Sequence, residues 1–156
     1  MNRIDTLKTL LEREENERDA VRLASERAQR DAEAAREQAR QLTDYRSDYR
    51  AKWSERFTRG QSIEIVRHYQ NYMGRLDQAV AQQDLVAARA EGQQQAAFAR
   101  LREAETRVAS VQKLIERRLH AERQAADRRE QKAVDEAASR SRSNRFSAFG
   151  FAATTT

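Results

Sequence analysis

The chain has 156 residues, of which 35% are charged and 38% are hydrophobic, with no Pro, no Cys and only four Gly. Much of the hydrophobic fraction is Ala, so a conventional globular core is not expected, and the surplus of good helix formers predicts long helices. The lack of Cys excludes disulfides and thiolate metal ligands, and no stretch approaches the roughly 18 apolar residues of a membrane-spanning helix.

The net charge of +5 is spread thinly along the chain. Residues 1–60 hold 14 basic and 13 acidic residues, residues 61–115 hold 7 and 6, and residues 116–156 hold 9 and 6. Nucleic-acid binding favours a concentrated basic face, so this distribution argues against it. Acidic residues also occur too early for a signal peptide, and we expect a soluble cytoplasmic protein.

In the first half, apolar residues recur at alternating spacings of four and three, which is typical of a coiled-coil helix. Ten of the fourteen positions of this seam are apolar, well above the 38% of the whole chain. The pattern predicts a helix over about residues 4–57. The seam positions are Leu7, Leu11, Glu14, Arg18, Val21, Ser25, Ala28, Ala32, Ala35, Ala39, Leu42, Arg46, Tyr49 and Trp53.

A stronger seam follows in the second half, where thirteen of fifteen positions are apolar. It predicts a second helix over about residues 63–140. Its positions are Val66, Tyr69, Met73, Leu76, Val80, Gln83, Ala87, Ala90, Gln94, Ala97, Leu101, Ala104, Val108, Val111 and Ile115.

The turn between the helices is predicted at residues 58–62. Gly60 suits the position after a helix C-terminus, and Ser62 suits the N-cap of the next helix. A break this short joins antiparallel neighbours. Folding the chain about residue 59 places Tyr49 against Tyr69 and small residues mostly against small ones, so we expect an all-α architecture: a long antiparallel two-helix coiled-coil hairpin over residues 1–140.

The seam fails past Ile115, where only one of the next six positions is apolar. The second helix is therefore expected to overhang the first as a single polar helix. Residues 141–156 are low in complexity and are expected to form a disordered tail. Phe146, Phe149 and Phe151 within it are a candidate docking motif, and the alternative is an untethered tail.

No pattern in the chain is typical of catalysis. There is no nucleophile–base pair, no Gly-rich phosphate loop and no cluster of metal ligands, and an extended hairpin lacks the cleft that catalysis usually needs. His68 and His120 are far apart and fit solvated helix positions. We expect no enzymatic activity, no cofactor and no small-molecule substrate, and function is expected to lie in contacts with partners.

Three motifs around the predicted turn resemble those of the FliJ family of flagellar export proteins. The first is L-x-D-Y-R-x-D-Y-R, which contains Tyr45 and Tyr49 in the first helix. The second runs from Asn71 to Gln83 and reads N-Y-x-x-x-L-x-x-A-V-x-x-Q, and the third runs from Arg128 to Ala138 and reads R-x-E-Q-K-x-x-D-E-x-A. The resemblance covers roughly residues 5–140.

The resemblance implies an antiparallel coiled coil similar to the stalk of rotary ATP synthases. It would lie in the pore of the hexameric flagellar export ATPase, promote the ring's assembly and turnover, contact the cytoplasmic domain of the export-gate membrane protein and handle export chaperones. It would be cytoplasmic and peripheral to the inner membrane through these partners.

Two surfaces are expected to make these contacts. Tyr49 lies on the seam of the first helix and is expected mainly to pack against the second helix. Tyr45 lies at the edge of the seam and is better placed to contact a partner. One residue departs from the family, since Gln83 stands where relatives can carry His. The family's gate-docking surface corresponds here to Gln38, Leu42, Tyr45, Tyr49, Tyr72, Leu76, Ala79 and Gln83. Basic residues suited to acidic loops inside the ATPase ring are Arg117, Arg118, Arg123, Arg128, Arg129 and Lys132, for which a solvated face with local ion pairs is the alternative.

Two other functions stay open from the sequence. One is a scaffold coiled coil that tethers partners without stimulating an enzyme. The other, a helical nucleic-acid-binding protein that uses residues 116–156, is disfavoured because six acidic residues interleave the nine basic ones there.

Overall fold

The computed structural model describes residues 2–150, which form two helices and no strand. Helix α1 spans Arg3–Thr58 and helix α2 spans Ile63–Gly150. Residues 13–108 form one compact unit, and among the described residues 2–12 and 109–150 form a second. The all-α two-helix hairpin expected from the sequence is confirmed, and the predicted start and end of the first helix are each within one residue of those of α1.

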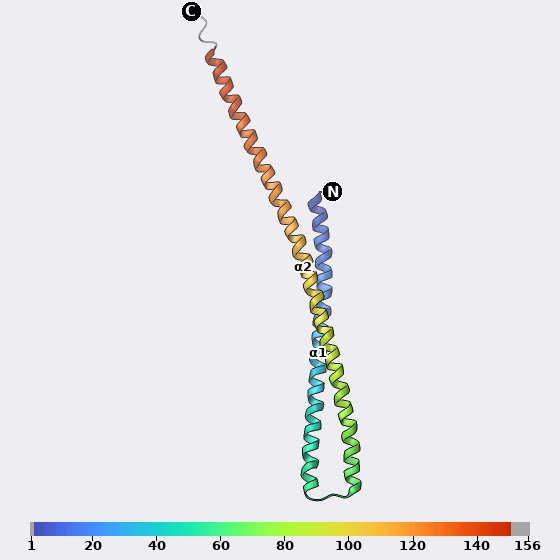
Figure 1. Cartoon of the computed structure of the whole chain (residues 1–156). Coiled ribbons are helices and arrows are strands. Elements are labelled where there is room, and N and C mark those ends of the chain that lie inside the picture. The colour runs from blue at the N-terminus through green and yellow to red at the C-terminus, as the bar shows by residue number, and fades with distance from the viewer. Residues whose placement is uncertain (1, 151–156) are drawn as a thin grey trace, which may run out of the picture. The chain divides into compact units, whose positions relative to one another are not determined.

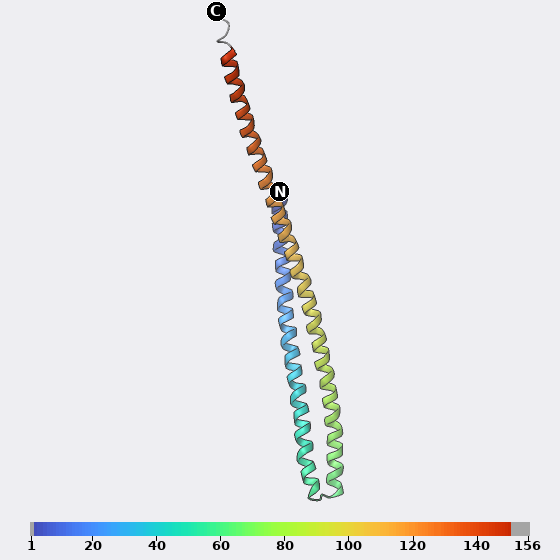
Figure 2. The same ribbon diagram turned by 60° about the vertical axis from the view of Figure 1, so that its left-hand side comes forward.

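In the unit of residues 13–108, α1 and α2 lie side by side and antiparallel on either side of the turn in both views (Figure 1, Figure 2). The turn has the predicted chemistry. Gly60 adopts a φ of 84°, a left-handed conformation that favours Gly because it has no side chain. The backbone N–H of Gly60 donates to the carbonyl of Phe57 at 3.1 Å, and the Ile65 N–H points at the Ser62 hydroxyl oxygen at 3.5 Å. Gly60 therefore ends α1, and Ser62 caps α2.

The burial pattern follows the predicted seams. In residues 13–108 each seam position of either helix is buried or half-buried, while most of the remaining side chains are exposed. Such a match shows that the four–three spacing selects the packed face of each helix. The buried residues of this unit are Ser25, Ala32, Ala35, Met73, Leu76, Val80, Ala104 and Val108.

The pairing register differs from the prediction by less than one helical turn. The predicted contact of Tyr49 with Tyr69 is present, with ring centroids 6.0 Å apart. Three other contacting pairs, Gln38–Gln83, Tyr49–Tyr72 and Glu14–Arg107, each have residue numbers that add to 121 rather than the predicted 118. The reason is the turn. The helices are joined by residues 59–62, so the hairpin folds between Gly60 and Gln61 and not about residue 59.

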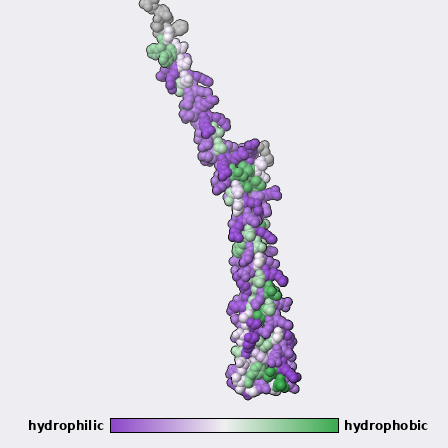
Figure 3. All heavy atoms as spheres, in the orientation of Figure 1, coloured by the Kyte–Doolittle hydropathy of each residue, from purple (hydrophilic) through white to green (hydrophobic). Residues whose placement is uncertain are grey.

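Side-chain size explains how the helices of this unit separate. Near the turn the seam carries large aromatic residues such as Tyr49, Trp53 and Tyr69, and Figure 1 shows the two ribbons spread apart there. Ala32, which is fully buried, and Ala35 lie farther from the turn, where small side chains allow close approach. Hydrophilic residues cover most of the face seen in Figure 3, as a two-helix core predicts.

In the second unit, Ile4 of α1 and Val111 of α2 are buried. Residues Asn2–Ile4 and residues 118–129 of α2 line one surface hollow. Helix α2 therefore stays in contact with the start of α1 beyond Ile115. The shifted pairing register places residues of α2 after Ile115 opposite the first residues of α1. All side chains of residues 126–150 are exposed, which makes this part of α2 the single polar helix expected from the sequence.

The end of α2 differs from the prediction. The helix continues through Gly150, so residues 141–150 are helical where a disordered tail was expected. Nothing in this stretch interrupts a helix, since it lacks Pro and its one Gly comes at the end. The remaining residues of the predicted tail, including Phe151, lie outside the described part of the chain. None of the described helices is long and apolar enough to cross a membrane.

Candidate functional site

Six of the eight residues predicted to dock on the export gate form one connected surface across both helices. The Gln83 side-chain amide donates to the Gln38 oxygen at 3.3 Å, and the Tyr45 and Tyr72 hydroxyl groups hydrogen-bond at 3.0 Å. Leu42 lies between these contacts, lining a hollow with Gln38, Tyr45 and Gln83. We call this surface the tyrosine strip: Gln38, Leu42, Tyr45, Tyr49, Tyr72 and Gln83.

The other two predicted gate residues differ in accessibility. Leu76 is only 7% exposed, because it is a seam residue packed between the helices, so it offers a partner almost no surface. Ala79 is exposed on α2. Leu76 therefore acts on the strip by holding the two helices together.

Tyr49 is the centre of an aromatic cluster that continues the strip toward the turn. Its ring centroid lies 4.7 Å from that of Tyr72, 6.0 Å from Tyr69, 6.1 Å from Tyr45 and 6.2 Å from Trp53. Aromatic pairs at these distances are favourable beyond the area they bury. Tyr49 is half-buried and Tyr45 is 48% exposed. The structure thus agrees with a mainly packing role for Tyr49 and an accessible Tyr45.

The cluster extends farther toward the turn than the sequence predicted. The Phe57 ring contacts those of Trp53 and Tyr69 at 5.6 and 5.0 Å, and the Arg56 guanidinium lies 5.0 Å from the Trp53 ring centroid. Phe57 lies four residues after Trp53 on the same side of α1, but the next seam position is Arg56, so the four–three spacing did not identify it.

The two Arg residues of the D-Y-R repeat converge on one carboxylate of α2. Arg46 is 3.2 Å from an Asp77 carboxylate oxygen and Arg50 is 3.7 Å from the same oxygen. Sequence reasoning missed Asp77, because only the pairing register of the two helices brings it to the repeat. The contact links the two helices beside the tyrosine strip.

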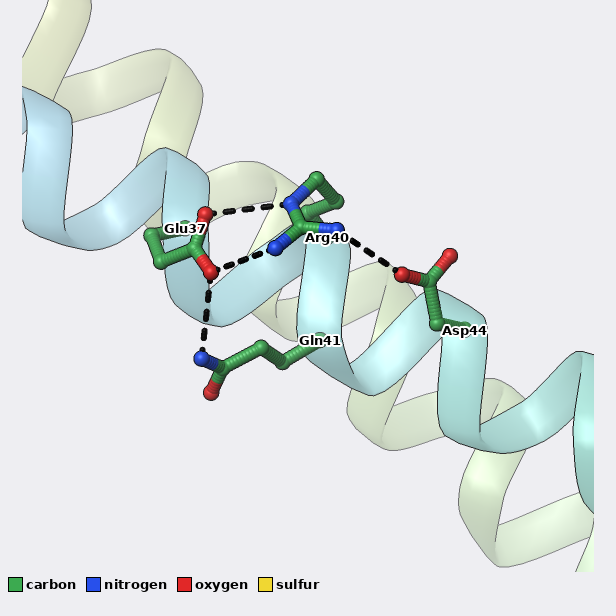
Figure 4. Close-up of polar contacts among 4 residues, drawn as sticks. All are labelled: Glu37, Arg40, Gln41 and Asp44. Carbon is green, nitrogen blue, oxygen red and sulfur yellow. Dashed lines mark hydrogen bonds and ion pairs between the residues drawn. The ribbon is translucent and has the colours of Figure 1, made fainter.

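A second polar group borders the strip on α1 (Figure 4). The Arg40 guanidinium donates to both Glu37 carboxylate oxygens, at 3.0 and 2.6 Å, and to Asp44 at 3.1 Å, while Gln41 donates to Glu37 at 3.1 Å. The hydrogen bond from Arg40 lowers the pKa of Glu37, with the Gln41 hydrogen bond acting in the same direction. Glu37 therefore holds the Gln41 amide at the edge of the strip.

Hydrogen bonding also changes the acidity of the strip itself. The contact with the Tyr45 hydroxyl raises the pKa of the Tyr72 phenol, and desolvation acts in the same direction. The folded protein therefore holds the Tyr72 proton more tightly, and either hydroxyl of the pair can be the donor.

Tyr45 separates two open hollows on the surface of the hairpin. One, of about 330 Å³, is lined by Gln38, Gln41, Leu42, Tyr45 and Gln83. The other, of about 400 Å³, is lined by Tyr45, Asp48, Tyr49, Lys52, Trp53 and Arg56. Open hollows around an exposed tyrosine suit binding to another protein's surface, where aromatic residues are favoured contacts.

The predicted ATPase-ring residues all belong to the second unit and are exposed. At about 100° per residue, five of them fall within an arc of about 120° on one side of α2, and Arg123 falls on the opposite side. Arg118 and Arg129 line the hollow beside Arg3. We call the shared side the basic face: Arg117, Arg118, Arg128, Arg129 and Lys132.

The six acidic residues of residues 116–136 are divided between the two sides of the helix, since Asp135 and Glu136 fall on the basic face and Glu122 borders it. Glu116, Asp127 and Glu130 share the side of Arg123 by the same geometry. The basic face therefore carries both signs of charge, in agreement with the interleaved acidic and basic residues of the sequence. Among the described residues, no group of three or more His, Asp or Glu is placed to hold a metal ion.

Comparison with known families matches the chain to the model described as "Flagellar FliJ protein" over residues 3–146. Comparison with curated proteins and with solved structures gives no match. The matched range includes the tyrosine strip, the turn and the basic face. Since it covers nearly all of the chain, this protein belongs to the flagellar FliJ family.

Proposed function

We propose that this protein is a non-catalytic stalk of the flagellar type III export apparatus. It promotes assembly and activity of the export ATPase ring and links the ring to the export gate and to export chaperones. Membership of the FliJ family implies a role in flagellar protein export. The more specific role is supported by the two surfaces described above.

The observation that carries the proposal is the tyrosine strip. Its side chains come from both helices and are joined by the Tyr45–Tyr72 and Gln38–Gln83 hydrogen bonds. Residues so connected are held in place before a partner arrives, which lowers the entropy lost on binding. We propose that the strip binds the cytoplasmic domain of the export gate, with Tyr45 as its most accessible aromatic residue.

The basic face supports a contact with the ATPase ring. Five cationic side chains on one side of α2 can attract acidic loops, and their exposure allows contacts that break and re-form. The protein would then be cytoplasmic and peripheral to the inner membrane through its partners.

The stalk role is tested by adding the protein to the export ATPase and measuring ATP hydrolysis and hexamer formation. We expect both to increase. A protein that binds the ATPase but changes neither property is a scaffold, and that result would refute the stalk proposal. Replacing Arg128 and Arg129 by Gln should reduce the effect, whereas replacing Arg123 by Gln on the opposite side should reduce it less.

Gate docking is tested by measuring binding of the Tyr45→Ala and Tyr72→Ala variants to the gate's cytoplasmic domain. We expect each to weaken binding by about tenfold or more, as for aromatic residues at the centre of an interface. Leu85→Ala is the matched control, because Leu85 is 64% exposed and lies outside the strip. Undiminished binding by both folded Tyr variants would refute this surface.

A further inference from the structure

The last turns of α2 carry two phenylalanines that do not pack into the core formed by the described residues. Phe146 and Phe149 are 84% and 81% exposed, more than the other large hydrophobic residues of the described chain. Together with Arg145 they line a hollow of about 250 Å³. Neighbouring exposed aromatic side chains form an apolar patch, and exposed apolar patches mark sites of contact with proteins or membranes.

Positive charge accompanies these aromatic residues. Residues 137–150 contain Arg140, Arg142 and Arg145 and no Asp or Glu. At about 100° per residue, two of these Arg residues fall with the two Phe within an arc of about 100°. We call this surface the terminal face: Arg142, Arg145, Phe146 and Phe149.

We propose that the terminal face binds directly to an anionic phospholipid bilayer. Arg side chains near an anionic membrane surface are attracted by its negative potential. Their aliphatic stems lie along the acyl boundary while the guanidinium groups stay at the headgroups. Aromatic rings are favoured at this interface, so the two Phe enter it beside the Arg residues.

The arrangement fits a bilayer better than a groove on another protein. Helices that dock in grooves use apolar anchors over two or more turns. Here the anchors occupy one turn, and the position four residues before Phe146 is Arg142. A bilayer needs no shaped pocket, and its affinity for a helix comes from the apolar area buried together with electrostatic attraction to anionic lipids. The absence of acidic residues in this stretch also removes repulsion from anionic headgroups.

The proposal is tested by vesicle flotation of the full chain. Vesicles of phosphatidylglycerol and phosphatidylcholine should carry the protein, and vesicles of phosphatidylcholine alone should carry much less. Replacing Phe146 and Phe149 together by Ser should weaken binding by about tenfold or more. Replacing Arg142 and Arg145 by Gln should weaken it roughly fivefold for each residue, and added salt should weaken the binding of the unmodified chain.

Two controls match these changes. Val134→Ser alters an exposed apolar residue of the same helix outside the terminal face, and Arg128→Gln with Arg129→Gln removes the same charge elsewhere on α2. Both should retain more binding than the terminal-face variants. Circular dichroism confirms that each variant keeps its helices, which is expected because all the altered side chains are exposed.

A fluorescence experiment separates insertion from adsorption. In a Trp53→Phe background, Phe149→Trp provides the single Trp of the chain. Its emission should shift to the blue with anionic vesicles and be quenched by brominated acyl chains. An unshifted, unquenched emission would show that the ring stays in water and would overturn the proposal.

Other results would also overturn it. These are no flotation with anionic vesicles, equal flotation with neutral ones, or full binding by the double Ser variant. Polyglutamate serves as a probe for an acidic protein surface or another polyanion. If polyglutamate competes fully with anionic vesicles and replacement of Phe146 and Phe149 does not change binding, residues 137–150 bind polyanions through charge alone. That result would also overturn the proposal.

Discussion

At the scale of single residues, the D-Y-R repeat combines a packed tyrosine with an exposed one. Tyr49 packs against four aromatic rings, whereas Tyr45 is half exposed and tied to Tyr72 through one hydrogen bond. The spacing of four places both Tyr on neighbouring turns of the same helix side. The two Tyr differ in exposure because Tyr49 is a seam residue, whereas Tyr45 lies one position before the seam residue Arg46.

The Tyr45–Tyr72 hydrogen bond predicts a change in alkaline titration. The folded state holds the Tyr72 proton more tightly than the unfolded state, since the pKa of Tyr72 is raised. Its contribution to stability is therefore complete below the ordinary phenol pKa of about 10 and is lost as pH rises through the raised value. Tyr45→Phe should return the pKa of Tyr72 toward its ordinary value, as measured by NMR of labelled Tyr. Tyr69→Phe is the control and should leave the pKa of Tyr72 raised. If Tyr72 has the same pKa in both variants, the Tyr45 hydrogen bond does not cause the shift.

Close helix approach predicts a position-specific effect of side-chain size. Ala32 is fully buried and Ala34, two residues along, is exposed. Ala32→Leu should lower the free energy of unfolding by about 1–3 kcal/mol through overpacking, while Ala34→Leu should change it by less than about 0.5 kcal/mol. Urea denaturation measures both. Equal effects at the two positions would mean that Ala32 does not face the partner helix.

At the scale of the elements, the turn decides which residues of the two helices meet. A connection centred between Gly60 and Gln61 makes paired residue numbers add to about 121, which brings Gln38 to Gln83 and Tyr49 to Tyr72. The tyrosine strip therefore depends on a turn that contributes no residue to it.

Two Gly→Ala substitutions, one in the turn and one inside α2, should change the stability of the protein in opposite directions. Gly60→Ala should destabilise the protein by about 1 kcal/mol, because Gly60 has a φ of 84° that Ala adopts only with strain. Gly74→Ala should stabilise it by about 0.5–1 kcal/mol, because Gly74 is inside α2 with open space for a methyl group. Thermal unfolding measures both changes. A stabilising Gly60→Ala would show that the turn is not held in this conformation.

At the scale of the whole molecule, each unit has only a narrow seam to bury. No side chain larger than Ala is fully buried among the described residues, and in residues 126–150 every side chain is exposed. Two helices cannot enclose a deep pocket, so partners are expected to meet surfaces: the tyrosine strip, the basic face and the terminal face.

Uneven burial predicts uneven protection of backbone amides. Residues 126–150 should exchange hydrogen for deuterium faster than residues 66–111, because single helices open locally while packed ones open with the hairpin. Mass spectrometry of peptic fragments resolves the two ranges. Equal protection would indicate that residues 126–150 are covered by another part of the protein or by a second copy.

The packed face of each helix was predictable from the sequence, because burial in a two-helix structure follows a local spacing of four and three. Gly60, Ser62 and the helix termini at the turn were predictable for the same reason, since caps depend on a few neighbouring residues. The continuation of α2 to Gly150 was missed, because low sequence complexity was given more weight than the absence of helix breakers.

Only the tertiary structure decided which residues meet across the helices. The Arg46 and Arg50 contacts with Asp77 and the Gln38–Gln83 hydrogen bond depend on the pairing register. A shift of three residue numbers leaves each seam unchanged but changes which residues lie directly opposite one another, although Tyr49 still contacts Tyr69 as predicted. Periodicity within one helix therefore identifies the faces, and the turn and the packing of the aromatic rings determine the contacts between them.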